Sequence, residues 1–347
     1  MTDKIIYLET GSTDPYYNLA FEETVLTRRR EGYYIILWQN DNTIVIGQNQ
    51  NTDAEINHEA VEQYHVNVVR RSTGGGAVYH DLGNLNYSFI TDEDKAEKIA
   101  FERFTTPIVD ALKNLGLDAS ASGRNDILVS GRKVSGVAQR YLNHRVLHHG
   151  TLLFDEDLDM ANKVLHVDPE KIRSKGVKSV RSRIGNIKEL LLEAESQAPD
   201  NPADSSPVRS LDSIAGFKSY IKECLVCGGC EEGTLTEEEL AEVSRLHKEK
   251  YATWEWNYGK SWACDIINKK KLDGGMLEPH IALDHGRITK IRFFGDYMSL
   301  TPADELEEAL RGCEYKKDSI LNILKRFDTA KIFGSISAEE VADVCCM

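Results

Sequence analysis

Three consecutive glycines, Gly74, Gly75 and Gly76, follow almost directly on two arginines, Arg70 and Arg71. Glycine has no Cβ and tolerates positive φ, so a run of glycines lets the backbone curl around a phosphate and offer it several N–H groups. An arginine guanidinium adds a fixed, forked positive charge. The segment therefore predicts a polyphosphate-binding site. The alternative is a solvent-exposed turn between two strands.

A second segment, residues 125–140, alternates apolar and other residues about a Ser130-Gly131 turn, which predicts a β-hairpin. Lys133 lies in the second strand of this hairpin. Its ammonium could act in a narrow cleft as a compact charge for a carboxylate or a phosphate. The alternative is a solvent-facing lysine, which is the commoner place for this residue type. Arg132 should point to the opposite face, because successive strand side chains alternate.

The first half of the chain alternates short apolar runs with amphipathic stretches. Runs rich in β-branched and aromatic residues predict strands at 5–8, 33–38, 43–46, 66–70, 85–90, 127–129, 133–138 and 146–154. Helical periodicity predicts helices at 19–29, 54–64, 98–115 and 159–165. Short connections at 40–42 and 143–144 favour hairpins. We therefore expect an α+β domain with mixed, largely antiparallel sheets and flanking helices.

The length of 347 residues suits two domains. The Pro- and Ser-rich stretch 195–210 predicts a flexible excursion, and Thr236 followed by Glu239 predicts a capping box that begins the last helix of the first domain. We place the boundary near residue 250, giving domains 1–250 and 251–347. The second domain is predicted to be a small α+β unit with strands at 254–267, 281–283 and 288–294, a turn at 273–275, and helices at 303–310 and 319–327.

Charge and composition narrow the class of protein. The net charge of −14 disfavours generic nucleic-acid binding. No stretch approaches the roughly 20 apolar residues that span a bilayer, and the first residues do not resemble a secretory signal, so we expect a cytoplasmic protein that does not bind membranes. Between residues 171 and 188 there are seven basic residues and no glutamate. This segment predicts an anionic ligand or partner, and the alternative is a solvated charged loop.

The seven cysteines are an odd number, which favours reduced thiols over a disulfide framework. Cys224, Cys227 and Cys230 have a spacing that metal sites use, with Cys264 or His247 as a distant fourth ligand. No second pair of metal-binding residues follows at a suitable spacing. We therefore favour a thiol-rich turn over a metal site.

Together, the glycine and lysine segments resemble the lipoate-protein ligase family, within the biotin and lipoate ligase superfamily. Further matching pieces are residues 43–51 (TIVIGQNQN), 148–154 (HHGTLLF) and 178–184 (KSVRSRI), and residues 256–261 (WNYGKS) look like the opening of the family's C-terminal accessory domain. The resemblance covers most of the chain. It implies a ligase-like catalytic domain that joins lipoate to ATP as lipoyl-AMP, releases pyrophosphate, and passes the lipoyl group to a lysine of a lipoyl-domain protein.

The resemblance also implies roles for particular residues. Lys133 would be catalytic and bridge the lipoate carboxylate and the α-phosphate, and Arg71 would bind phosphate. Asp126 would hold Mg²⁺ or orient Lys133, and His149 would shape the acyl pocket. The segment 171–188 would close over the adenylate. The full predicted set for ATP, Mg²⁺ and lipoate is Arg70, Arg71, Ser72, Gly74, Gly75, Gly76, Ala77, Val78, Tyr79, Asn84, Asp126, Lys133, Ser135, Gly136, His149, Gly150 and Arg183.

Three other functions remain open at this stage. An octanoyl or lipoyl amidotransferase shares the large domain but works through a cysteine thioester, and no cysteine precedes Cys224. A biotin ligase or a non-catalytic lipoate binder is a weaker alternative. The acceptor, by resemblance, is the glycine cleavage H protein or the acyltransferase subunit of a 2-oxo acid dehydrogenase, and the acid is lipoate or octanoate.

Overall fold

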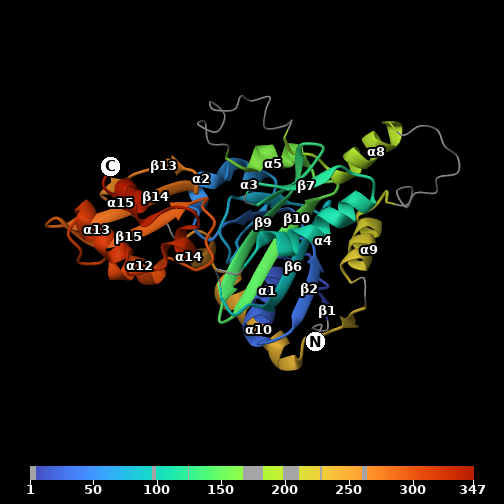
Figure 1. Ribbon diagram of the computed structural model, residues 1–347, viewed down its shortest axis with the longest axis horizontal. Coiled ribbons are helices and arrows are strands. Elements are labelled where there is room, and N and C mark those ends of the chain that lie inside the picture. The colour runs from blue at the N-terminus through green and yellow to red at the C-terminus, as the bar shows by residue number, and fades with distance from the viewer. Residues whose placement is uncertain are drawn as a thin grey trace.

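An eight-stranded mixed sheet forms the middle of the larger, N-terminal unit in the computed structural model (Figure 1). The structure describes residues 5–95, 99–123, 125–166, 183–197, 211–226, 229–259 and 264–347. The strand order is β11-β1-β2-β6-β10-β9-β8-β7, with β1 parallel to both of its neighbours and the other pairs antiparallel. The strands are β1 (Ile5–Glu9), β2 (Tyr33–Trp38), β6 (Asn84–Asp92), β7 (Ala119–Ser122), β8 (Asp126–Val129), β9 (Arg132–Leu142), β10 (Arg145–Leu153) and β11 (Glu231–Glu232).

A separate three-stranded sheet has the order β4-β3-β5, formed by β3 (Thr43–Ile46), β4 (Asn67–Arg70) and β5 (Val78–His80). The predicted hairpin at residues 40–42 is therefore wrong, because β2 and β3 belong to different sheets. Both hydrogen-bonding edges of β2 are taken by β1 and β6, while β3 is buried and pairs with β4 and β5.

Two-residue turns with positive φ join the antiparallel strands. Ser130 and Gly131 have φ of 49° and 77°, and Asn143 and His144 have φ of 48° and 63°. Such turns match the right-handed twist of the strands they connect, as in type I′ hairpins. The hairpins predicted at residues 130–131 and 143–144 are thus confirmed.

The two faces of the large sheet bury different elements. Leu37 and Tyr87 point into a core covered by α4 (Phe101–Asn114), α8 (Ile187–Gln197) and α9 (Ile214–Leu225). Ile36 and Ile90 point the other way, toward α1 (Pro15–Arg28), α10 (Glu237–Leu246) and residues of the three-stranded sheet. The predicted capping box at the start of α10 is confirmed, with Thr236 and Glu239 bonded reciprocally.

Two predicted elements in this unit are wrong. Residues 54–64 form two short helices, α2 (Thr52–Glu55) and α3 (His58–Gln63), because Asn57 caps the second one by accepting a bond from Ala60 N. The strand predicted to begin at Trp254 is instead a helix, α11 (Trp254–Asn257), capped by Thr253. Its aromatic pattern is helical, since Trp254 and Tyr258 are four residues apart and stack at 6.0 Å.

The C-terminal unit has its own sheet and core (Figure 1). Its elements are β12 (Ile266–Ile267), β13 (Lys270–Leu272), β14 (Gly275–Asp284), β15 (Arg287–Gly295), α12 (Asp304–Ala309), α13 (Lys317–Leu324), α14 (Thr329–Phe333) and α15 (Ala338–Cys345). The segments around Tyr251, Trp256 and Tyr258, which include η3 (His247–Tyr251), pack on clusters of the larger unit. The boundary near residue 250 stays a prediction. No helix in the described ranges is long and apolar enough to cross a membrane.

Candidate active site

A cavity of about 130 Å³ lies between the large sheet and the three-stranded sheet. The large sheet, α1 and the β8 hairpin supply one part of its wall, and β3, β5 and the glycine segment supply the other. The lining residues are Leu19, Trp38, Val45, Arg71, Gly75, Gly76, Ala77, Val78, His80, Asn86, Asn125, Lys133, Gly136, Val137, Ala138, His149, Gly150 and Thr151.

The strand register explains why residues distant in sequence meet in this wall. Trp38 on β2 pairs with Asn86 on β6, and Asn86 pairs with Thr151 on β10. Thr151 Oγ1 accepts a bond from Gly136 N on β9 at 3.1 Å. These four residues form a row across four adjacent strands. With strands about 4.8 Å apart, the row is about 14 Å long and runs from Trp38 at one end toward Lys133 at the other.

Arg71 shapes the glycine segment from within. Its guanidinium donates to the carbonyls of Gly74 at 2.6 Å and Gly76 at 2.8 Å, to Val45 O, and through Nε to Thr73 Oγ1. Gly75 between them has φ of +90°, which favours glycine. Burial lowers the pKa of Arg71 to about 10, so the group stays protonated at neutral pH.

A buried chain of hydrogen bonds supports the cavity wall behind Arg71. His149 Nδ1 lies 2.9 Å from Glu22 Oε1, and His149 Nε2 lies 2.8 Å from Thr73 Oγ1. Thr73 Oγ1 also accepts a bond from Arg71 Nε at 3.0 Å, so it links the His149 ring to the guanidinium. Ser88 also donates to Glu22 Oε1, at 2.6 Å. The network connects α1 and β10 to the glycine segment and fixes the orientation of the His149 ring.

Lys133 stands at the mouth of the cavity, with its Nζ 2.7 Å from Asp126 Oδ1. A β-bulge places it there, because Leu128 pairs with Lys133 whereas Ile127 pairs with Ser135. The extra residue brings Lys133 and Gly136 to the same face, where a Cβ at position 136 would lie 3.2 Å from Nζ. About a third of the Lys133 side chain is exposed, so the ammonium is less buried than a closed cleft would make it.

The main chain of Lys133 also forms hydrogen bonds with the end of the basic segment, residues 171–188. Lys133 N donates to Arg183 O at 2.5 Å, and Gly185 N donates to Lys133 O at 3.0 Å. Arg132 points away from the cavity, as predicted, and forms an ion pair with Glu193 on α8. Most of the segment 171–188 lies outside the described residues, so its predicted closure stays a prediction.

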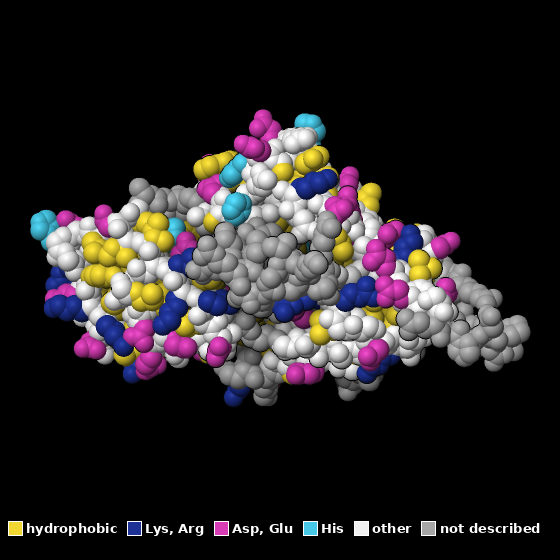
Figure 2. Space-filling model, turned by 90° about the horizontal axis from the view of Figure 1, so that it is seen from above, with side chains coloured by type: hydrophobic (Ala, Val, Ile, Leu, Met, Phe, Trp, Pro, Cys, Tyr) yellow, Lys and Arg dark blue, Asp and Glu magenta, His cyan; other side chains and the backbone are white. Residues whose placement is uncertain are grey.

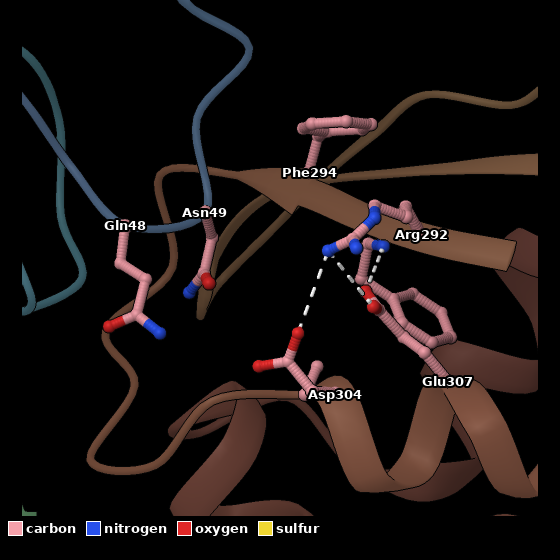
Figure 3. A pocket seen from close by; sticks show the side chains of 8 residues that line it. Gln48, Asn49, Arg292, Phe294, Asp304 and Glu307 are labelled. Atoms are coloured by element: carbon pink, nitrogen blue, oxygen red, sulfur yellow. Dashed lines mark hydrogen bonds and ion pairs between the residues drawn. The ribbon is translucent and has the colours of Figure 1, made fainter. Parts of the chain in front are cut away.

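The C-terminal unit contacts the glycine segment. Gly75 N donates to Tyr297 O at 3.3 Å, and Gly295 N donates to Asn49 O at 2.8 Å. A small polar pocket lies at this contact, where Gln48 and Asn49 face Arg292 of β15 (Figure 3). Arg292 forms ion pairs there with two carboxylates of the α12 region, Asp304 at 3.6 Å and Glu307 at 3.4 Å.

Comparisons with known proteins identify the family of the chain. Residues 14–198 match the lipoyl protein ligase A/B catalytic domain, and residues 261–344 match the bacterial lipoate protein ligase C-terminus. The lipoate-protein ligase LplJ of Bacillus subtilis is 39% identical over 95% of this chain and 96% of its own length. The chain belongs to the lipoate-protein ligase family.

Two solved structures of ligases of this kind resemble the chain in fold. A bipartite lipoate protein ligase, solved as part of an archaeal lipoylation system with its E2 lipoyl domain from Thermoplasma acidophilum, has a TM-score of 0.62 and 28% identity. The match covers 77% of this chain and 100% of the archaeal chain. Lipoate-protein ligase A bound with ATP has a TM-score of 0.59 and 26% identity, covering 75% and 99%. The α+β fold class predicted from the sequence is thereby confirmed.

The structure brings together about half of the residues predicted for a lipoate-protein ligase site. Those that line the cavity are Arg71, Gly75, Gly76, Ala77, Val78, Lys133, Gly136, His149 and Gly150. Asp126 is adjacent through its ion pair with Lys133, and Arg183 through its carbonyl. Ser72, Gly74, Tyr79 and Ser135 are next to lining residues in sequence without lining the cavity, and Asn84 bonds to the lining residue Asn86.

Arg70 is the clearest departure from the prediction, because the structure does not bring it to the cavity. Its guanidinium is fully buried on the other side of β4 and donates to Gly47 O at 2.8 Å, Gln50 O at 2.7 Å and Thr52 Oγ1 at 2.6 Å. Arg70 is the last residue of β4 and Arg71 follows it, and the two guanidinium groups bond to different sets of carbonyls. Arg70 instead joins the loop after β3 to α2.

Sequence reasoning missed several residues of the site, among them Trp38, His80 and Asn86, which line the cavity, and Glu22, which bonds to the lining residue His149. Glu22 lies in the middle of α1 and Asn86 in the middle of β6, without a motif of their own. Only the pairing of β2, β6 and β10 places Trp38 and Asn86 side by side. For Asn86 and His80, the available sequence signal was a polar side chain within a largely apolar strand.

The described cysteines of this ligase stand apart from the cavity. None of the described residues that line it is a cysteine. Cys224 and Cys230 pack on the core of the opposite face of the sheet, and Cys227 lies outside the described residues, so the role of the cluster stays a prediction.

On the face that Figure 2 shows, Asp and Glu side chains lie among the Lys and Arg side chains of the described residues.

Proposed function

We propose that this chain is an ATP-dependent lipoate-protein ligase that forms lipoyl-AMP in the cavity between Lys133 and Trp38 and passes the lipoyl group to a lysine of a lipoyl-domain protein. The observation that carries the proposal is one cavity with an ammonium and a glycine segment at one end and apolar side chains at the other. A mostly apolar pocket with a few convergent polar groups is the usual form of a small-molecule site.

ATP is needed because a carboxylate is too poor an electrophile to acylate an amine. In the first step a lipoate carboxylate oxygen attacks the α-phosphorus of ATP, a new P–O bond forms, and the bond to the β-phosphate oxygen breaks to release pyrophosphate. The protein's task in such a step is to align the reactants and stabilise negative charge. Lys133 meets this need at the cavity mouth, where its ammonium reaches both the carboxylate and the α-phosphate.

The glycine segment supplies the second group of donors. Gly76 and Ala77 line the cavity, and we assign their backbone amides to the phosphate oxygens. Arg71 positions these amides through its bonds to Gly74 O and Gly76 O. Its positive charge also favours the binding of an anion at the glycine segment. We further propose that Arg71 contacts a phosphate of ATP directly.

The acyl chain follows the row from Gly136 to Trp38. A length of about 14 Å accommodates an extended eight-carbon acid with its carboxylate at Lys133. Leu19, Val45 and Trp38 line the apolar end. Burial of the chain against these side chains contributes about 25 cal/mol per Å² of apolar surface removed from water.

Asp126 supplies a carboxylate at the mouth that fits a magnesium ion, and Asn125 lines the same cavity. Mg²⁺ prefers oxygen ligands and is commonly held by one or two carboxylates together with substrate phosphates. Asp126 presents such a carboxylate beside Lys133. A bound Mg²⁺ would neutralise charge on the phosphates, and Asp126 orients Lys133 in either case.

The second step needs no nucleophile from the protein. A neutral lysine amine of the acceptor attacks the acyl carbonyl of lipoyl-AMP, and the bond to AMP breaks. We propose that the acceptor is a lipoyl domain, of the glycine cleavage H protein or of a 2-oxo acid dehydrogenase acyltransferase, and that the reaction takes place in the cytoplasm, where ATP is available.

Exchange of labelled pyrophosphate into ATP tests the proposal. We expect exchange that depends on lipoate or octanoate and needs no acceptor protein, because adenylate formation is reversible. An amidotransferase or a passive binder would give no exchange. Absence of exchange with both acids, in a protein that is folded and binds ATP, would overturn the proposed function.

A further inference from the structure

Two hydrogen-bond donors at the apolar end of the cavity have no partner among the described residues. They are Nδ2 of Asn86 and Nε2 of His80. Both residues line the cavity, and their side chains are almost fully buried, with exposed fractions of 2% for Asn86 and 3% for His80. Buried polar groups in folded proteins nearly always have a partner, so each exception calls for a ligand or a structural reason.

Hydrogen bonds to neighbouring asparagines orient both groups in the structure. Asn86 Oδ1 accepts a bond from Asn84 Nδ2 at 3.2 Å, which leaves the Asn86 amide nitrogen as the free end. Asn40 Nδ2 lies 3.2 Å from His80 Nδ1, so Nδ1 acts as the acceptor and Nε2 carries the proton. Burial, with smaller effects of Arg71 and His149, lowers the pKa of His80 to about 3, so the ring is a neutral donor near neutral pH.

Both donors belong to the Trp38 end of the cavity. Asn86 is the cross-strand partner of Trp38, and His80 is bonded to Asn40, two residues beyond Trp38. Asn86 comes from the large sheet and His80 from the three-stranded sheet, so the two side chains belong to opposite walls. From β9, which carries Lys133, to β6, which carries Asn86, there are two strand spacings, or about 10 Å.

A plain hydrocarbon tail would leave both N–H groups buried and unpaired, which is costly. Lipoate and octanoate share a carboxylate and an eight-carbon chain, but lipoate carries sulfur on carbons 6 and 8, near the far end. Divalent sulfur is a weak hydrogen-bond acceptor. If the carboxylate lies at Lys133, these sulfurs reach the depth of Asn86 and His80.

We propose that Asn86 and His80 determine acid specificity by donating hydrogen bonds to the dithiolane sulfurs, so that the cavity prefers lipoate to octanoate. This inference rests on the proposed function, because it places the carboxylate at Lys133. Neither residue touches the reacting atoms. They contact the tail of the acid, so they affect the preference for lipoate over octanoate and not the reaction at the carboxylate.

The test compares kcat/KM for lipoate and for octanoate in the pyrophosphate exchange assay. We expect the wild-type chain to favour lipoate, and Asn86→Leu and His80→Phe each to lower the lipoate-to-octanoate ratio about fivefold to tenfold, since a site built for a polar contact discriminates against a ligand that lacks it. The conservative variants Asn86→Ser and His80→Gln keep a donor and should retain most of the preference.

The outcomes separate this inference from the function on which it rests. Equal losses for both acids in Asn86→Leu would assign Asn86 a structural role only and overturn the inference, as would a wild-type chain without preference. Exchange that fails with both acids would overturn the proposed function instead. Should the apolar variants fail to fold, a crystal structure of the wild-type chain with lipoate decides, because sulfurs beyond hydrogen-bonding distance of both donors would contradict the inference.

Discussion

At the scale of single residues, the site depends on side chains whose surroundings give each a different task. Lys133 lies at the cavity mouth beside Asp126, and Arg71 lies within the protein beneath the glycine segment. The sequence predicted that both would matter. It could not show that Arg71 also shapes the glycine segment, because that role depends on which carbonyls lie within reach of the guanidinium in the folded chain.

Replacing Lys133 with Ala should reduce lipoate-dependent pyrophosphate exchange at least about 10²-fold, because the charge that stabilises the transferring phosphoryl group is lost. The matched control is Arg132→Ala, which removes the neighbouring cation on the opposite face and breaks only the ion pair with Glu193. Circular dichroism checks that both variants fold. Exchange at the wild-type rate in the Lys133 variant would show that another group has this role.

Replacing Arg71 with Met should lower the free energy of unfolding by about 3 kcal/mol. The carbonyls of Val45, Gly74 and Gly76 each lose a donor, at roughly 1 kcal/mol apiece. The KM for ATP should rise in the same variant. Urea unfolding measures the first effect, with Arg311→Met as a control that removes only a surface pair with Glu308. Equal stabilities of the two variants would contradict the role given to Arg71.

At the scale of secondary-structure elements, local patterns were predictable and long-range pairings were not. The turns at 130–131 and 143–144 were recognisable because their residues tolerate positive φ, and the capping box of α10 lies within four residues of sequence. The separation of β2 from β3 into two sheets depends on partners far along the chain. The cavity lies between those two sheets, so its far end, including Trp38 and Asn86, could not be predicted.

The β-bulge in the β8–β9 hairpin gives a test at this scale. Gly136→Val should place a branched side chain against Lys133 Nζ and Cε, which lie 3.2 and 3.3 Å from the position of a Cβ. A displacement of about 1 Å in a catalytic group can reduce the rate about 10²-fold. We expect kcat for adenylate formation to fall by that order with little change in thermal stability.

Ser120→Val, on the exposed strand β7 of the same sheet, is the control for adding a β-branched residue there. A Gly136 variant with normal kcat would show that the crowding is relieved without moving the lysine.

At the scale of the whole molecule, buried histidines predict how stability depends on pH. Burial lowers the pKa of His80 and of His148 to about 3, against about 6.5 when unfolded. As pH falls below about 6.5, the unfolded chain takes up protons that these two groups in the folded chain do not. Each therefore removes about 1.4 kcal/mol of stability per pH unit. Glu156, whose pKa burial raises well above its usual value, acts in the opposite direction.

The variant His148→Phe isolates one of these contributions. His148 stacks on Phe104 at 4.9 Å, so a phenyl ring fits its surroundings. Between about pH 6.5 and pH 5, the unfolding free energy of the variant should fall less steeply than that of the wild type, by about 1.4 kcal/mol per pH unit. Urea unfolding at several pH values measures the two slopes, and parallel slopes would mean that His148 is protonated in the folded chain.

The two units of the molecule meet at the glycine segment, where Tyr297 O accepts from Gly75 N. The family matches and the fold both identify the chain as a lipoate-protein ligase, and the cavity indicates where the acid is activated. A crystal structure with lipoyl-AMP tests that mechanism. We expect the α-phosphate and acyl carbonyl beside Lys133 Nζ, the phosphate on the amides at 76 and 77, and the dithiolane ring near Trp38. An adenylate bound outside this cavity, or a Lys133 side chain turned to solvent in the complex, would contradict it.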